Sequence, residues 1–142
     1  MTCEDLDSDF YQYNDNLTDN FTYGEFFSGD RKLGKKSIEP PQEYFEYVMA
    51  CAEQLQNIRD LIKVPIIITS AYRTDDWNRR VGGSKNSLHL RGLAVDTRAI
   101  GLPLFVYYSY ILKYTKFNQY GYYRLKNFIH SGLLNDFVIF KY

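Results

Sequence analysis

The chain has little of several features that define other classes of protein. No apolar run approaches the roughly 18 residues that a membrane-spanning helix needs, so we expect no membrane span. The N-terminus is acidic and lacks a basic segment followed by an apolar one, so we expect no signal peptide and synthesis in the cytoplasm. Cysteine occurs only at Cys3 and Cys51, too few for a disulfide framework and without the spacing of a metal site.

Positive charge is absent from residues 1–20, which carry six acids. Because the whole chain has 17 basic and 17 acidic residues, residues 21–142 carry 17 basic and 11 acidic residues, a net charge of +6. We interpret residues 1–20 as an acidic tail without regular structure and residues 21–142 as one domain. An alternative is that the tail covers a basic groove until a partner displaces it.

Aromatic residues are abundant, with 14 Tyr and 10 Phe in 142 residues. Hydrophobic residues make up 45% of the chain and charged residues 24%, which is typical of a globular protein. So many rings predict a large buried apolar area for a chain of this length, and some of them are expected to line a substrate groove.

Two main helices are predicted. After Pro40 and Pro41, apolar residues recur every three or four positions, which indicates a helix over 40–62 that Pro65 keeps from continuing. A second helix is expected over 103–116. Its predicted apolar face is Leu104, Phe105, Tyr108, Ile111, Leu112 and Thr115. Shorter helical segments are expected near 21–27 and 77–81, the latter capped by Thr74.

Short strands account for most of the remaining pattern. The β-branched run at 66–69 predicts a buried strand, and the alternation over 92–98 predicts a second. Three more are expected at 120–125, 127–131 and 136–141. The fold class is therefore α+β, with two main helices packed on a small, mostly antiparallel sheet.

The chain has only two histidines, His89 and His130, and Asp96 follows His89 by seven residues. Two imidazoles and one carboxylate suit a zinc ion with an open fourth position. On a straight helix His89 and Asp96 would lie about 10.5 Å apart, too far to share an ion, so a bend at Arg91–Gly92 is required. His130 would then arrive from a neighbouring strand. The alternatives are that His130 is a core histidine and that Asp96 pairs with Arg91 or Arg98.

The residues around this set resemble a known signature. SAYRT at 70–74, VGG at 81–83 and S-x-H-x-x-G-x-A-x-D at 87–96 resemble the zinc D-alanyl-D-alanine peptidases, which share their fold with the Hedgehog signalling domain. The resemblance covers about residues 21–131 and is closest to the short single-domain branch common in bacteriophages. It implies a Hedgehog-like fold and a Zn²⁺ ion held by His89, Asp96 and His130.

The same resemblance implies roles beside the metal. Arg73 matches the arginine that stabilises the oxyanion of the scissile carbonyl, a task suited to a fixed guanidinium. The alternative for Arg73 is an ion pair with Asp75 or Asp76. Ser87 matches a position that binds the substrate's peptide or carboxylate.

The catalytic carboxylate of the family is missing from its usual places. Family members carry an acid three residues before or two residues after the last histidine ligand, and these positions are Asn127 and Gly132 here. Neither side chain can act as a general base. The remaining candidates are Asp136, the nearest in sequence, and Asp75, Asp76 and Glu25. Alternatively, none of these acids acts as the base and hydrolysis has been lost.

Together these observations predict zinc-dependent hydrolysis of peptide stems in bacterial peptidoglycan, of carboxypeptidase or endopeptidase type. The protein would be a phage endolysin or virion-associated peptidase, made in the host cytoplasm and acting on the cell wall, an anionic polymer that a net charge of +6 suits. The alternative is a catalytically silent peptidoglycan-binding or virion structural module. We interpret the cluster of Arg79, Arg80, Lys85 and Arg91 near Trp77 as a groove rim and expect no nucleic-acid partner. The sequence does not indicate an oligomeric state.

Overall fold

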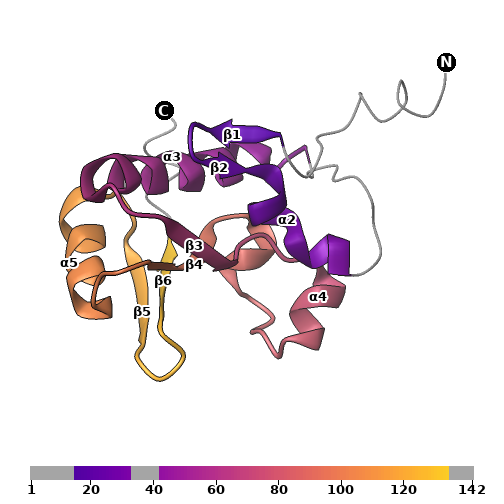
Figure 1. Cartoon of the computed structure of the whole chain (residues 1–142). Helices are drawn as coiled ribbons and strands as arrows, with labels where there is room; N and C mark the ends of the chain where they lie inside the picture. Colours follow the sequence, from indigo (N-terminus) through magenta and orange to yellow (C-terminus); the bar gives the residue numbers. More distant parts are fainter. Residues whose placement is uncertain (1–14, 33–41, 135–142) are drawn as a thin grey trace, which may run out of the picture.

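Four antiparallel strands in the order β3-β4-β6-β5 form the sheet that carries the rest of the fold (Figure 1). The computed structural model describes residues 15–32 and 42–134. Its elements, in order, are β1 (Asn16–Thr18), β2 (Phe21–Thr22), α2 (Tyr23–Lys32), α3 (Phe45–Ile62), β3 (Ile66–Ser70), α4 (Asp75–Arg80), the 3₁₀ helix η1 (Leu88–Arg91), β4 (Ala94–Ala99), α5 (Leu104–Tyr114), β5 (Gln119–Tyr123) and β6 (Phe128–Gly132). The predicted α+β class is confirmed.

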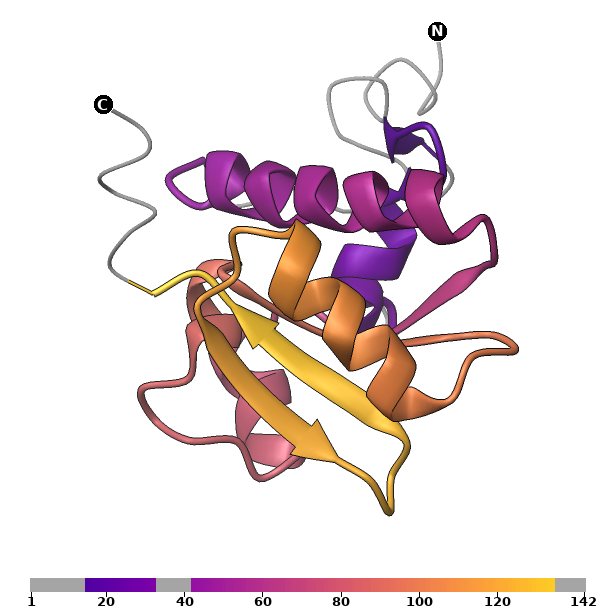
Figure 2. The same ribbon diagram turned by 90° about the vertical axis from the view of Figure 1, so that its left-hand side faces the viewer.

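The two long helices pack together beside the sheet. α3 runs across the end of α5, and α5 contacts β4 and β6 (Figure 2). The core between them is apolar and aromatic. Its largest fully buried side chains include Phe21, Phe26, Phe27, Leu55, Ile58, Tyr107, Ile111 and Ile129. Cys51 also lies in this core, as its helical context predicts.

The N-terminal part of the fold begins earlier than expected. Residues 16–18 form β1, which pairs with β2, although residues 1–20 were expected to lack regular structure. The pairing is stabilised by Gln56 of α3, whose side chain hydrogen-bonds to Thr18 and Asn20. Gln56 is therefore buried, not on the solvent face that its polarity predicts. Residues 1–14 lie outside the described residues.

The two main helices differ in detail from their predictions. α3 begins at Phe45, five residues after the expected start, because residues 42–44 form a turn; Pro40 and Pro41 lie outside the described residues. It ends at Ile62 as expected, and Lys63 caps it in the left-handed conformation at φ 58°.

β3 is half-buried where a buried strand was expected, because it is an edge strand of the sheet.

The predicted apolar face of α5 was right at Ile111, wrong at Phe105 and Leu112, and lacked Tyr107. Phe105 is 65% exposed and Leu112 47% exposed, whereas Tyr107 and Ile111 are fully buried. The helix is apolar on almost every side, so a three-to-four periodicity fits more than one face. The sheet selects the face that carries Tyr107, whose hydroxyl lies 2.6 Å from that of Thr97 on β4.

β5 and β6 form a hairpin, and each strand lies within a residue or two of its predicted bounds. The strand expected at 136–141 lies outside the described residues. Within residues 15–32 and 42–134, no helix is both long and apolar enough to span a membrane.

Candidate metal centre

Strand register brings two of the three predicted ligands together. Asp96 on β4 pairs directly with His130 on β6, so both side chains project from the same face of the sheet. His89 reaches them from η1, which ends at Gly92 with φ 74°. A Cβ at Gly92 would lie only 2.5 Å from Val48 of α3, so the bend needs glycine for space as well as conformation. One nitrogen of each histidine and one oxygen of Asp96 lie within 4.8 Å of one another.

Each imidazole is oriented by a hydrogen bond on the side away from Asp96. His89 Nδ1 donates to the Ala71 carbonyl at 2.6 Å, and its Nε2 faces Asp96 Oδ1 at 3.2 Å. His130 Nε2 donates to Gln119 Oε1 at 2.7 Å, which leaves Nδ1 facing Asp96 Oδ1 at 2.9 Å. Metal-binding histidines are normally fixed in this way, with the outer N–H held by a carbonyl or carboxylate.

The third candidate ligand, the carboxyl group of Asp96, is ionised at neutral pH. Burial by itself would raise the pKa of Asp96, but hydrogen bonds from His130 and His89, together with their charges, outweigh burial and lower the pKa to about 2. Asp96 does not pair with Arg91 or Arg98, so that alternative is wrong. Two oriented imidazole nitrogens and one carboxylate fit Zn²⁺, and they leave a further coordination position for another ligand.

Arg73 lies beside this cluster and is held by three groups. Its Nε donates to Ser70 Oγ at 3.0 Å and its Nη1 donates to Asn78 Oδ1 at 3.2 Å. Its Nη2 lies 3.5 Å from Asp96 Oδ2. A Cβ at Gly83 would lie 2.0 Å from Asn78 Oδ1 and 2.9 Å from Nη1, so a larger residue there would displace the side chains that hold the guanidinium. The guanidinium is therefore fixed in place before any substrate arrives.

Arg73 forms no ion pair with Asp75 or Asp76. Burial lowers the pKa of Arg73, while the negative charge of Asp96 acts in the opposite direction, and an arginine stays protonated in either case. Asp75 and Asp76 are both exposed on α4, and Asp76 pairs with Arg79 instead. The expected alternative of an ion pair between Arg73 and one of these acids is wrong.

A cavity of about 400 Å³ opens over the three candidate ligands. Ser87 lines it, and its hydroxyl also accepts a hydrogen bond from the His89 backbone N–H at 3.2 Å. The other lining residues are Arg73, Val81, Gly82, Gly83, Ser84, Asn86, Leu88, His89, Asp96, Gln119, Tyr123, Phe128 and His130. The structure thus brings Arg73, Ser87 and the candidate ligands to one pocket.

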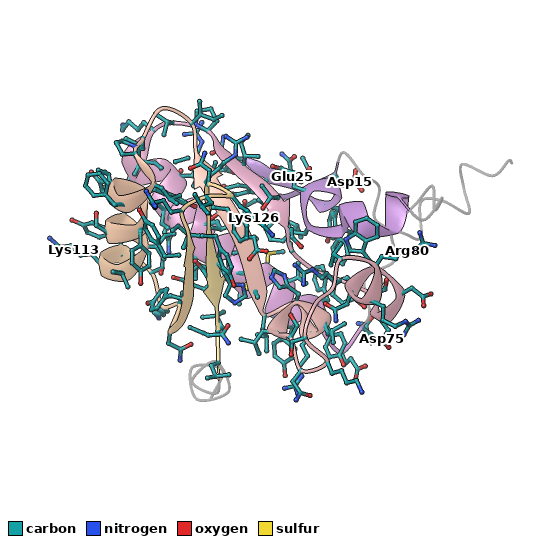
Figure 3. All side chains as sticks on the ribbon, turned by 90° about the horizontal axis from the view of Figure 1, so that it is seen from below. Asp15, Glu25, Asp75, Arg80, Lys113 and Lys126 are labelled. Carbon is teal, nitrogen blue, oxygen red and sulfur yellow. The ribbon has the colours of Figure 1, made fainter. Side chains whose placement is uncertain are left out.

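Asp96 is the only acid among the described residues that line this pocket. Glu25 hydrogen-bonds to Thr22 at the start of α2, and Figure 3 shows Asp75 on the outer side of α4. Asn127 occupies a hairpin position with φ 59°, a conformation that asparagine tolerates better than most residues. Asp136 lies outside the described residues.

Two residues of the pocket were missed by the sequence interpretation, Gln119 and Tyr123. Both lie on β5, where Gly121 pairs with His130, so positions 119, 121 and 123 share the face of His130. Gly132 leaves room for one of them, because a Cβ there would lie 2.6 Å from Gln119 Oε1. Alternation along β5 places them on one face of the strand, and the register of β5 against β6 makes this the face of His130.

Replacing Gln119 is expected to weaken metal binding. Gln119→Leu keeps the approximate size of the side chain but leaves His130 Nε2 without its acceptor, so zinc affinity should fall about 10- to 100-fold. Competition with a chelating dye measures the change, and Gln119→Glu, which retains an acceptor oxygen, should stay much closer to the unsubstituted chain. Equal zinc affinity for Gln119→Leu and the unsubstituted chain would show that the contact does not orient His130.

Comparison with known families places the whole pocket inside one match. The sequence model of a family described as Peptidase M15 matches residues 19–132. This range contains the sheet, Arg73, Ser87 and all three candidate metal ligands, and it ends before Asp136. No curated protein matches the chain.

Proposed function

Because the chain belongs to the Peptidase M15 family, a family of zinc peptidases, we propose that it hydrolyses the peptide stems of bacterial peptidoglycan. The observation that carries this proposal is the convergence of His89, Asp96 and His130, with one nitrogen of each imidazole directed at Asp96. The same pocket contains the fixed guanidinium of Arg73. We further propose that the bond lies at or near a D-amino-acid residue and that the protein serves a bacteriophage, as an endolysin or a virion-associated peptidase.

Each group has a distinct task in this reaction. His89, Asp96 and His130 would hold Zn²⁺, which supplies Lewis acidity and lowers the pKa of water towards neutrality. Arg73 can donate a hydrogen bond to the carbonyl oxygen of the scissile peptide as that oxygen becomes negatively charged. Ser87 and the loop at 82–86 form one wall of the pocket, where they can hydrogen-bond to the peptide backbone.

The alternative proposal is a zinc-containing module that binds peptidoglycan without cutting it. It is favoured by one observation, that Asp96 is the only acid among the described pocket-lining residues. Proton transfer from the attacking water normally needs a further base. Asp136, as the nearest acid in sequence, is our proposed base if hydrolysis occurs.

One experiment separates the two functions. The zinc-loaded chain is incubated with purified peptidoglycan, and released fragments are identified by mass spectrometry. Hydrolysis predicts new stem-peptide fragments whose release stops with a chelator and resumes with added zinc. Binding of the protein to insoluble peptidoglycan without any fragment, at full zinc content, would reject the peptidase and support the binding module.

A further inference from the structure

Tyr123 faces the pocket from the end of β5. It lies two residues beyond Gly121, which pairs with His130, so its side chain projects to the same side of the sheet as the candidate ligand. The pocket wall includes Tyr123 together with Arg73 and His130. Its ring is 47% exposed, as a residue at the mouth of a substrate pocket should be.

The ring of Tyr123 lies back over its own strand because Gly121 leaves space for it. A Cβ at Gly121 would lie 2.6 Å from Tyr123 Cε2 and 3.2 Å from His130 Cβ, so the phenol ring and His130 are neighbours across this glycine. Phe128, on the paired strand, stacks on the Tyr123 ring with centroids 4.6 Å apart and planes 14° apart. These contacts hold the ring beside the metal site.

Tyr123 and Arg73 line the same pocket above the candidate ligands. A tyrosine hydroxyl is a hydrogen-bond donor as well as an acceptor. Arg73 and Tyr123 therefore bring two different donors to one side of the candidate ligands, in a pocket with no second acid among its described residues.

We propose that Tyr123 is a catalytic residue whose hydroxyl, beside Arg73, donates a hydrogen bond to the scissile carbonyl oxygen as that oxygen gains negative charge. The proposal rests on the proposed peptidase function. No proton leaves the hydroxyl, and the hydrogen bond strengthens as the carbonyl oxygen becomes an oxyanion. Such an interaction acts on the transition state more than on the bound substrate, so it should appear in kcat and not in KM.

Tyr123→Phe tests the proposal because it removes only the hydroxyl and keeps the ring that stacks on Phe128. With a synthetic stem peptide, kcat should fall about 100-fold while KM stays nearly unchanged, as expected for loss of one oxyanion donor. The matched control is Tyr122→Phe. Tyr122 is the neighbouring residue on the opposite face of β5, is 41% exposed and contacts Tyr108, so its substitution should leave kcat unchanged.

A binding measurement gives a second readout that does not depend on turnover. A phosphinate analogue of the stem peptide, which mimics the tetrahedral transition state, should bind zinc-loaded Tyr123→Phe about 100-fold more weakly than the unsubstituted chain. Zinc affinity itself should be equal in the two proteins, because Tyr123 lies outside the candidate ligand set.

The outcomes distinguish this proposal from the proposed function. If the unsubstituted chain cleaves the peptide and Tyr123→Phe cleaves it equally well, the role of Tyr123 is wrong and the peptidase stands. A higher KM at unchanged kcat also overturns the role, because it would show recognition of the bound substrate alone. If the zinc-loaded unsubstituted chain neither cleaves peptide nor binds the phosphinate, the peptidase itself is wrong and the role of Tyr123 is rejected with it.

Discussion

His89→Ala is expected to lose its zinc on purification and to lose hydrolysis with it. His89 is 2% exposed, and its Nε2 is one of only two imidazole nitrogens available to the candidate metal centre. Removing a direct ligand should cost more than the roughly 10- to 100-fold in affinity that loss of an outer hydrogen-bond partner costs. Elemental analysis of the purified chain and fragment release from peptidoglycan measure the two effects.

The control for this substitution must separate metal loss from unfolding. Asp76→Asn removes a carboxylate that is exposed on α4 and pairs with Arg79, so it should keep both zinc and activity. Circular dichroism of His89→Ala and of the chelator-treated unsubstituted chain should give similar spectra, since both lack the metal but retain the sheet. A folded His89→Ala protein that holds a full complement of zinc would contradict the assignment of His89.

Arg73→Ala is expected to lower kcat about 100- to 1,000-fold while zinc remains bound, the effect of removing a fixed oxyanion donor. Arg73→Lys keeps the positive charge but cannot contact Ser70, Asn78 and Asp96 at the same time. Its kcat should therefore stay close to that of Arg73→Ala. Steady-state kinetics on a stem peptide, with zinc content measured in parallel, gives the result.

Arg80→Ala is the matched control for Arg73. Arg80 is an exposed arginine of α4, labelled on the outer side of that helix in Figure 3, and it does not line the pocket. Its loss should leave kcat unchanged. If Arg73→Ala instead lost zinc in proportion to activity, Arg73 would act by holding Asp96 and not by contacting the substrate.

The grouping of His89, Asp96 and His130 was suggested by spacing and selected by the family resemblance. The chain has only two histidines, a bend was required after His89, and strand alternation fixed the direction of Asp96. The bend at Gly92 and the pairing of Asp96 with His130 agree with that reasoning. Spacing alone left other interpretations of His130 and Asp96 open, and the resemblance of residues 70–96 to the zinc peptidases selected this grouping.

Other features depend on packing that the sequence pattern does not encode. The buried face of α5 was only partly predicted, with Tyr107 missed, because an almost wholly apolar helix has no distinctive stripe. Gln119 and Tyr123 were missed because their direction depends on the register of the β5–β6 hairpin. The setting of Arg73 was missed for a similar reason, since Ser70, Asn78 and Gly83 meet around it only once the loop has closed.

The most direct test of the metal centre is X-ray absorption at the zinc edge on the purified full chain. The geometry predicts one zinc ion with two imidazole nitrogens and carboxylate oxygen at about 2.0–2.2 Å, and no sulfur neighbour. A sulfur neighbour at about 2.3 Å, which only cysteine would supply at that distance, would contradict the assignment of His89, Asp96 and His130. So would a folded chain that binds no zinc when the ion is in excess.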